Sequence, residues 1–281
     1  MSALSLGIIA AFAWGFHDIC VRYLSQRTPL LAALLTVLIV GLLFHIGVMV
    51  VEDGFAPLTA QTTWMALLSG MFFLMASLGL YGAFQRGPVK LVAPIIASYP
   101  VLSLVWALIR GTQISAWQWG AVIAIIIGVS LVAALAQHDH EGSPPAGPTI
   151  AFSLIAAAGF AGTFALGQYA SEISGHLPVT LVTRITALAL LIGGMGVLRL
   201  PFWPGLHALP VLVLMGIADG IALLCVLAAG GLPDAQYAAV ASSCFGLLTI
   251  LMAWAFLREK MTSPQWAGCA IAFSGIGYLA L

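Results

Sequence analysis

Charged side chains are scarce in this chain of 281 residues, since Asp, Glu, Lys and Arg together make up 6% of it. Soluble domains contain about 25% of these residues, whereas 62% of this sequence is hydrophobic. A soluble core cannot bury so much apolar surface, so lipid must cover most of it. The nine basic and nine acidic residues balance, which excludes the clustered basic face of a nucleic-acid-binding protein. The composition predicts a protein of the lipid bilayer.

Cysteine is also rare, and its spacing argues against disulfides and metal sites. Each of the four cysteines stands alone in an apolar run, without a C-x-x-C pattern, so we interpret them as small packing residues. The stretch 138–141, His-Asp-His-Glu, contains metal-ligand residue types. Its flanks are rich in glycine and proline, which is typical of a solvated connector. The sequence predicts neither a metal site nor a cofactor.

The N-terminus lacks the basic residues of a secretory signal. Met1 to Ser5 contain no lysine or arginine, and the apolar run continues to about Leu24. This run is too long for the hydrophobic region of a signal peptide. We therefore expect it to be the first membrane span.

Long apolar runs are what the sequence has in abundance. An α-helix needs roughly 20 residues to cross about 30 Å of hydrocarbon, and ten stretches reach that length. The runs are continuous and do not alternate with a period of two, which favours helices over a β-barrel. We expect an all-α integral membrane protein with ten transmembrane helices, at residues 4–24, 30–51, 63–85, 89–110, 115–136, 149–170, 178–199, 207–229, 234–257 and 263–281.

The second half of the sequence repeats features of the first. The segment 106–110, Trp-x-x-x-Arg, recurs at 254–258, and the residues that follow recur in the same register. Each half holds five predicted helices, and because five is odd the second half must enter the membrane from the opposite face. Transporters with such inverted repeats bind substrate at mid-membrane. The expected organisation is repeat 1 at 1–137, a linker at 138–148, and repeat 2 at 149–281.

Over essentially its whole length, the chain resembles the EamA type of the drug/metabolite transporter superfamily. The motifs that carry the resemblance are Trp14-Gly15, Pro94, Pro178 followed by Arg184, and Arg258-Glu259-Lys260 followed by Gln265-Trp266 and Gly268. The first half departs from the pattern, because Gly111 stands where the glutamate is expected. The small multidrug-resistance proteins, which are related, carry a glutamate midway along their first helix, whereas this sequence has Ala13-Trp14-Gly15 there.

The resemblance implies a multi-pass exporter of the bacterial inner membrane. Its substrates would be amino acids or other small metabolites, and drugs in some members. Protons are a candidate coupling ion, and the protein is expected to be a monomer or a weak homodimer. The resemblance places both termini in the cytoplasm, whereas basic residues in the odd-numbered loops place them outside by the positive-inside rule. Both orientations stay open.

Asp219 is the clearest charged residue inside a predicted span. A charge at the centre of a membrane helix costs at least ~2.5–3.5 kcal/mol, so it requires a reason. Asp219 could be a cavity carboxylate that binds a substrate amine or a proton, or a structural acid paired with Arg184. Gly216 and Gly220 form a small-x-x-x-small step beside it, which allows a neighbouring helix to approach closely.

The first predicted helix carries a second group of polar residues. Trp14, Asp18 and Arg22 are spaced by four residues and lie on one helix face, where Asp18 and Arg22 can pair. We expect Trp14 and Asp18 to line the cavity, with packing as the alternative. His17 points some 100° away, and a packing role is as plausible for it.

Three further residues complete the predicted substrate site. Arg184 could hold a carboxylate with two parallel hydrogen bonds, or it could be the fixed partner of Asp219. Tyr81 and Tyr99 could form aromatic walls, with the membrane interface as the alternative location. Pro94 and Pro100 flank Tyr99 and predict a kinked helix, which is typical of cavity-lining segments.

Other classes of membrane protein find less support in the sequence. An intramembrane enzyme would need a nucleophile with a base, paired aspartates or a metal motif, and G-x-S-x-G, H-E-x-x-H and D-D-x-x-D are all absent. A channel would need a filter repeat or a ring of charges, and neither is visible. Transport by alternating access is the function that the sequence predicts, with drug or cation efflux as an alternative to metabolite export.

Overall fold

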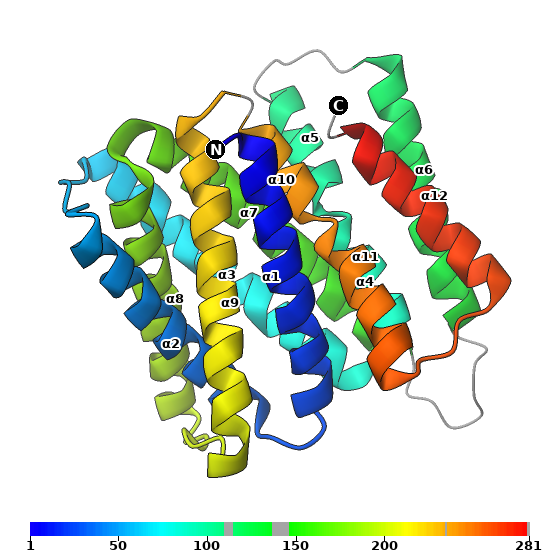
Figure 1. Cartoon of the computed structure of the whole chain (residues 1–281), viewed down its shortest axis with the longest axis horizontal. Coiled ribbons are helices and arrows are strands. Elements are labelled where there is room, and N and C mark those ends of the chain that lie inside the picture. The colour runs from blue at the N-terminus through cyan, green and yellow to red at the C-terminus, as the bar shows by residue number, and fades with distance from the viewer. Residues whose placement is uncertain (110–114, 137–145, 234, 280–281) are drawn as a thin grey trace.

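A computed structural model describes the chain at residues 1–109, 115–136, 146–233 and 235–279 (Figure 1). These residues form helices and, within the same ranges, no β-strand. The α-helices are α1 (Ala3–Leu24), α2 (Leu30–Val51), α3 (Ala60–Arg86), α4 (Val89–Ala97), α5 (Tyr99–Ile109), α6 (Ala116–Ala136), α7 (Ala146–Ser174), α8 (His176–Val197), α9 (Leu209–Ala228), α10 (Gln236–Ser242), α11 (Phe245–Met252) and α12 (Ser263–Leu279). Short 3₁₀ segments η1 (Leu206–Ala208) and η2 (Ala229–Gly231) flank α9, and a π-helical turn η3 (Ala253–Leu257) follows α11.

Seven helical segments within these ranges are long and apolar enough to cross a membrane, at Ala3–Leu24, Leu30–Val51, Ala60–Arg86, Ala146–Ser174, His176–Val197, Leu206–Gly231 and Ala238–Leu257. Shorter apolar helices cover Val89–Leu102 and Ala116–Val132. The predicted all-helical class is confirmed for the described residues. The count of ten spans and the two repeats stay predictions, and the expected linker lies mostly outside the described residues.

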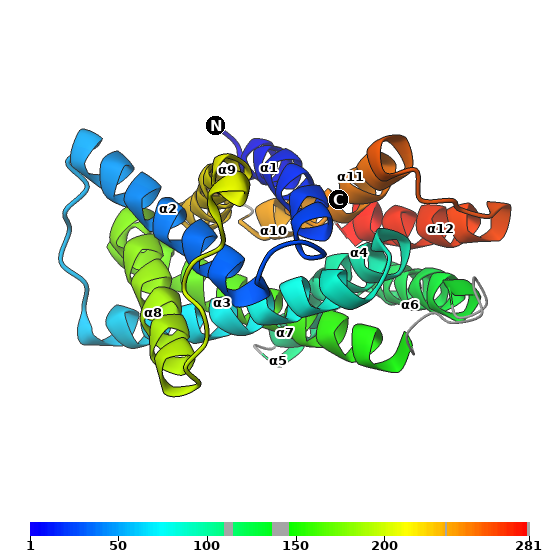
Figure 2. The ribbon, with the colours of Figure 1, turned by 90° about the horizontal axis from the view of Figure 1, so that it is seen from below.

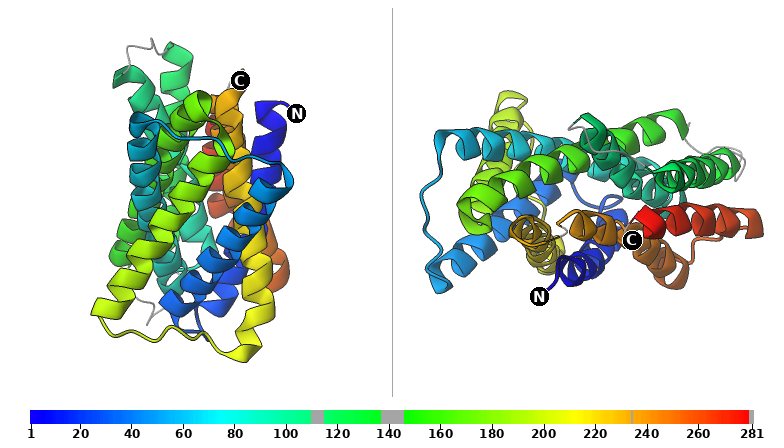
Figure 3. Two further views of the ribbon diagram at one scale, coloured as in Figure 1. Left: turned by 90° about the vertical axis from the view of Figure 1, so that its left-hand side faces the viewer. Right: turned by 90° about the horizontal axis from the view of Figure 1, so that it is seen from above.

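The helices form two layers, which are clearest in views along their axes (Figures 2 and 3). One layer contains α2, α9, α1, α10, α11 and α12, and the other contains α8, α3, α7, α5 and α6. Within the layers α1 packs on α9, and α3 packs along α7. Between them α2 contacts α8, and α6 contacts α12 at one edge of the molecule. Helix α4 contacts α7 of one layer and α11 of the other. The beginning of α1 and the end of α12 lie at the same end of the bundle.

Two predicted spans are interrupted near their middle. The fourth breaks at Ser98, between α4 and α5, as the prolines on either side predict. The ninth breaks at 243–244, between α10 and α11, where no proline predicts it. At both breaks serine hydroxyls donate to backbone carbonyls three residues back, from Ser98 to Ile95 and from Ser243 to Val240. Such bonds compete with the helical hydrogen-bond pattern, which gives the second break a local cause.

Small residues allow the close packing around α9. An ideal Cβ on Gly216 would lie 2.6 Å from the Cβ of Val40, and one on Gly220 would lie 2.7 Å from the ring of Phe44. Both neighbours belong to α2, so the small-x-x-x-small step faces a neighbouring helix as its spacing predicts. This contact fixes α9, and with it Asp219, against α2.

Candidate functional site

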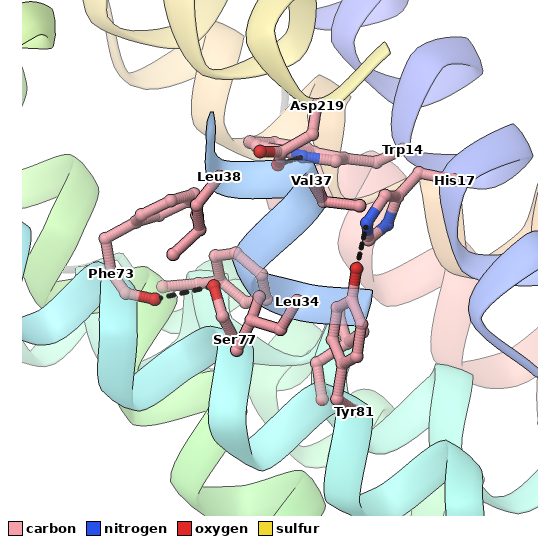
Figure 4. Close-up of a pocket in the computed structure, with 11 residues that line it drawn as sticks. Trp14, His17, Leu34, Val37, Leu38, Phe73, Ser77, Tyr81 and Asp219 are labelled. Carbon is pink, nitrogen blue, oxygen red and sulfur yellow. Dashed lines mark hydrogen bonds between the residues drawn. The ribbon is translucent and has the colours of Figure 1, made fainter. Parts of the chain in front are cut away.

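The candidate site is a small internal cavity between the two layers (Figure 4). Helices α1, α2, α3, α7 and α9 contribute its walls. About 10 Å³ of it is open to the centre of a water molecule, which is room for about one water. The lining residues are Trp14, His17, Leu34, Val37, Leu38, Phe73, Ser77, Leu80, Tyr81, Phe160 and Asp219.

The Asp219 carboxylate accepts two hydrogen bonds from two different helices. The indole N–H of Trp14 in α1 donates to Oδ1 at 3.1 Å. The Nη1 of Arg184 in α8 donates to Oδ2 at 2.5 Å. Charge-assisted bonds of this kind are the strong ones in a low-dielectric interior. Asp219 therefore lines the cavity and is also bonded to Arg184, so its position is compatible with both alternatives that the sequence left open.

Arg184 is fully buried, with 0% of its surface exposed. Its guanidinium lies over the ring of Phe73, 4.8 Å from the centroid, and against the backbone of Gly41. The Nε and Nη2 atoms have no hydrogen-bond partner. Arg184 does not line the cavity itself, so it acts on the cavity through Asp219.

A second polar cluster lies on the same wall, where α1 faces α3. The Nδ1 of His17 lies 3.0 Å from Oδ1 of Asp18, and its Nε2 lies 3.2 Å from the hydroxyl of Tyr81. His17 and Asp18 are both buried, and Oδ2 of Asp18 has no hydrogen-bond partner. The imidazole therefore links the Asp18 carboxylate to the cavity, as the sticks in Figure 4 show for its Tyr81 side.

Aromatic rings form the wall behind Trp14. Its indole stacks on Phe164 with centroids 5.5 Å apart and lies 5.7 Å from Phe160, both of α7. Phe245 of α11 meets it edge-on at 6.2 Å. Such pairs are worth about 0.5–1.5 kcal/mol beyond their buried area. The cluster fixes the orientation of the indole N–H that Asp219 accepts.

Three further polar residues, of which Tyr99 and Arg22 were named from the sequence, lie away from the cavity. The Tyr99 hydroxyl donates to the Ala239 carbonyl and bonds the Ser242 hydroxyl, so Tyr99 joins the two broken spans where they cross. His45 bonds the carbonyl of Gly220 through Nε2 at 2.8 Å, as expected of an interior histidine. Arg22 does not pair with Asp18, because its side chain turns to the end of α3.

Arg22 belongs to a cluster at the end of the bundle where α3 meets α4. Its Nη1 donates to the carbonyl of Phe84 at 2.8 Å, and its Nε lies 3.6 Å from Glu259. The Glu259 carboxylate also accepts from the backbone N–H groups of Val89 and Lys90, at the first turn of α4. A carboxylate at that position complements the helix dipole. Glu259 thus ties the segment after η3 to α1 and α4.

The structure places five of the six predicted site residues in the lining of the cavity or in a hydrogen bond with a lining residue, and Tyr99 is the exception. Trp14, Tyr81 and Asp219 line the cavity, and Arg184 bonds Asp219. Asp18 does not line the cavity and is connected to it only through His17. From the sequence, a packing role was equally plausible for His17. The apolar lining, including Phe73 and Phe160, has no signal in the sequence that separates it from lipid-facing residues. Within the described ranges, no group of three His, Cys, Asp or Glu side chains could hold a metal ion.

The arrangement can hold a small cation. A carboxylate, a tyrosine hydroxyl and a serine hydroxyl face one space, together with aromatic rings whose faces attract positive charge. The one buried arginine nearby is bonded to that carboxylate and lies outside the lining. An ammonium group would therefore find acceptors, whereas an anion would meet the Asp219 carboxylate.

Comparisons with known proteins agree with this architecture. The model of the EamA-like transporter family matches residues 1–134 and 147–281. No curated protein matches the sequence. Among solved structures 28 chains match. One of them, a crystal structure described only as that of a protein, is 16% identical and aligns with a TM-score of 0.74 over 99% of this chain and 98% of its own. At that identity the likeness shows a common fold.

Proposed function

Because this chain belongs to the EamA-like transporter family, and is therefore a membrane transporter, we propose that it exports small metabolites that carry an ammonium group, such as amino acids. The export would cross the inner membrane of a bacterial cell. The cavity between the two layers would be the substrate site, with Asp219 as the residue that binds the amine.

The observation that carries this proposal is the position of Asp219. A carboxylate deep in a membrane protein marks a substrate or ion pathway by default. Here it faces a cavity lined by Trp14, Phe73, Tyr81 and Phe160, and aromatic faces favour cations. Trp14 and Arg184 each donate a hydrogen bond to the carboxylate, which fixes its orientation in the wall of the cavity.

The helix contacts support two related halves. If the predicted spans are numbered in order, the third packs on the sixth (α3 on α7) and the eighth packs on the first (α9 on α1). Likewise the contact of α8 with α3 corresponds to that of α2 with α9. The contact of α4 with α7 corresponds to that of α10 with α1. Each contact therefore has a partner in which the roles of the halves are exchanged. This is the pattern expected of an inverted repeat.

Backbone conformation supports the same relation. Asp53 follows α2 with φ 48°, and Arg199 follows α8 with φ 53°. A non-glycine residue in the left-handed region is uncommon, and these two follow the second helix of each proposed half. We propose repeats at 1–137 and 149–281, joined by the linker 138–148, which rock against each other to open the cavity to either side in turn.

The aromatic lining favours one alternative, which is efflux of drug-like cations. Flat aromatic cations would bind the same rings and the same carboxylate. The two substrate classes differ in their tolerance of a carboxylate on the ligand, because Asp219 repels it unless Arg184 turns toward it. A ligand panel separates the two.

The test uses the purified protein with the twenty amino acids and ethidium as probes. A probe that binds the folded state raises its melting temperature, and probes that do so are then followed into proteoliposomes. We expect Asp219→Asn to lower uptake at least ten-fold, because the amide keeps the shape but loses the charge.

The matched control is Asp53→Asn, the same change at an exposed position between α2 and α3, which should transport like the wild type. Equal uptake by Asp219→Asn and the wild type would remove Asp219 from the substrate site. Stabilisation by ethidium alone would favour the efflux alternative.

A further inference from the structure

The buried charges around the cavity do not balance unless one proton is added. The titratable groups that face one another there are His17, Asp18 and Cys20 from α1, Tyr81 from α3, Arg184 from α8, Asp219 from α9, and His45 from α2 behind Arg184. The facing side chains of α7 and α11, Phe160, Phe164 and Phe245, carry no charge. Two carboxylates thus face one arginine.

Arg184 forms its ion pair with Asp219, so His17 is the only one of these groups that is hydrogen-bonded to Asp18. Arg184 donates to Asp219 at 2.5 Å, whereas the contact of Asp18 is with Nδ1 of His17 at 3.0 Å. Asp18 is 0% exposed, and an unpaired ionised carboxylate in such a place is strongly unfavourable. The Asp18–His17 pair is electrically neutral, and therefore less costly to bury, when it holds one additional proton.

The geometry allows the pair to bind and release that proton without movement of heavy atoms. With His17 protonated, Nδ1–H donates to Asp18 and Nε2–H donates to the Tyr81 hydroxyl. With His17 neutral, Nδ1–H still donates to Asp18, and Nε2 accepts from the Tyr81 hydroxyl instead. Both states fit the distances of 3.0 and 3.2 Å, since a tyrosine hydroxyl can donate or accept.

We propose that His17 and Asp18 form the proton-binding site that couples transport to a proton gradient, separate from the amine site at Asp219. This rests on the proposed transport function. His17 and Asp219 line the same cavity, so an ammonium group bound at Asp219 repels the imidazolium. The substrate cation enters as His17 releases one proton from Nε2 to water, and the charge in the cavity stays constant. The exchange is an antiport of one proton for one monovalent cation.

The decisive variant is His17→Gln, whose amide can still reach Asp18 or Tyr81 but cannot carry a proton. Asp18→Asn tests the other half of the pair, because it removes the charge that holds the proton. His207→Gln, at an exposed position of η1, is the matched control. The probes are again the twenty amino acids and ethidium, in proteoliposomes with and without an imposed pH difference.

We expect the wild type and His207→Gln to accumulate a probe at least ten-fold faster with the pH difference than without it. His17→Gln and Asp18→Asn should lose this acceleration. Exchange of labelled for unlabelled probe needs no net proton movement, so it should stay measurable in both, at a lower rate in His17→Gln because His17 lines the cavity. Equal acceleration in the wild type and both variants would overturn the proposal, and so would loss of exchange in both, which would make the pair part of the substrate site.

A second measurement does not depend on any substrate. Proton binding to the folded state makes its melting temperature depend on pH, so the curves of wild type and His17→Gln between about pH 5 and 9 should differ in slope, while that of His207→Gln follows the wild type. Coincident curves for all three would contradict the proton site. If no probe binds the wild type but the curves differ, the proposed substrate fails and the proton site stands.

Discussion

At the scale of single residues, the cavity depends on Arg184. It is the only fully buried arginine in the described part of the chain, and its bond to Asp219 joins α8 to α9. Two of its donors have no partner, so the ion pair itself compensates only part of the cost of burying the guanidinium. Removing one charge of such a pair is more damaging than removing both, because the other charge is left buried and alone.

We therefore expect Arg184→Gln to lower the free energy of unfolding by about 3–5 kcal/mol. The double variant Arg184→Gln with Asp219→Asn should lose less than Arg184→Gln alone, since no buried charge is left unpaired. Thermal unfolding in detergent measures both, with Arg27→Gln as the control at an exposed position near the end of α1. A double variant less stable than Arg184→Gln would contradict the account of the pair.

The charged residues of the site were predictable because each is costly in lipid. Asp219 and Arg184 stand out in apolar helices, and the structure brings them together, with Trp14 bonded to the same carboxylate. The aromatic residues were not predictable. Phe160, which lines the cavity, and Phe164, which packs behind it, are spaced by four residues. Phe12 and Phe16 have the same spacing and are exposed at the outside of α1. The sequence pattern is identical, and only the neighbouring helices distinguish the two pairs.

At the scale of elements, the two broken spans differ in how far they could be predicted. Pro94 and Pro100 predict the break at Ser98, because proline removes a backbone donor and crowds the preceding turn. The break at 243–244 depends on serine hydroxyls and on Gly246, whose Cβ position would lie 2.7 Å from the Cβ of Ala97 in α4. Tertiary packing of α11 on α4 is not visible in a list of residue types.

The contact of Glu259 with the first turn of α4 gives a prediction at this scale. Glu259→Gln removes the charge that two backbone N–H groups and Arg22 share. Helix-end charges in partly buried positions contribute up to about 2 kcal/mol, so we expect stability to fall by about 1–2 kcal/mol. Thermal unfolding measures it, with Glu172→Gln, at an exposed position of α7, as the control. Equal melting temperatures for the two variants would show that the charge does not hold α4.

At the scale of the whole molecule, the two layers place the proposed substrate and proton sites where the proposed halves meet. The composition predicted the membrane, and the run lengths predicted the helices, because both depend only on how much apolar surface lipid must cover. The arrangement of the helices in two layers could not be predicted from the sequence. It depends on which helix faces fit together, such as α3 against α7, and those faces are as apolar as the ones that lipid covers.

The proposed inversion predicts which loops share a side of the membrane. The connection between α2 and α3 and the connection between α8 and α9 lie at opposite ends of the bundle (Figures 1 and 3). In a cysteine-free background, Phe55→Cys and Trp203→Cys, both at exposed aromatic positions, should react with an impermeant maleimide from opposite faces of cells. Labelling of both from one face would contradict the inverted arrangement. The face that labels Phe55→Cys also decides the orientation of the termini.

The indole of Trp14 gives the molecule an optical reporter at its centre. Of the tryptophans whose side chains the structure describes, it is the one that is almost fully buried, at 3% exposure, while Trp266 is half-buried and the others are exposed. Its N–H is bonded to the carboxylate proposed to bind substrate, so a ligand that competes for Asp219 changes the polarity around the ring. In a variant whose only tryptophan is Trp14, the wavelength of maximal fluorescence should therefore report ligand binding at Asp219 in real time, without an added label.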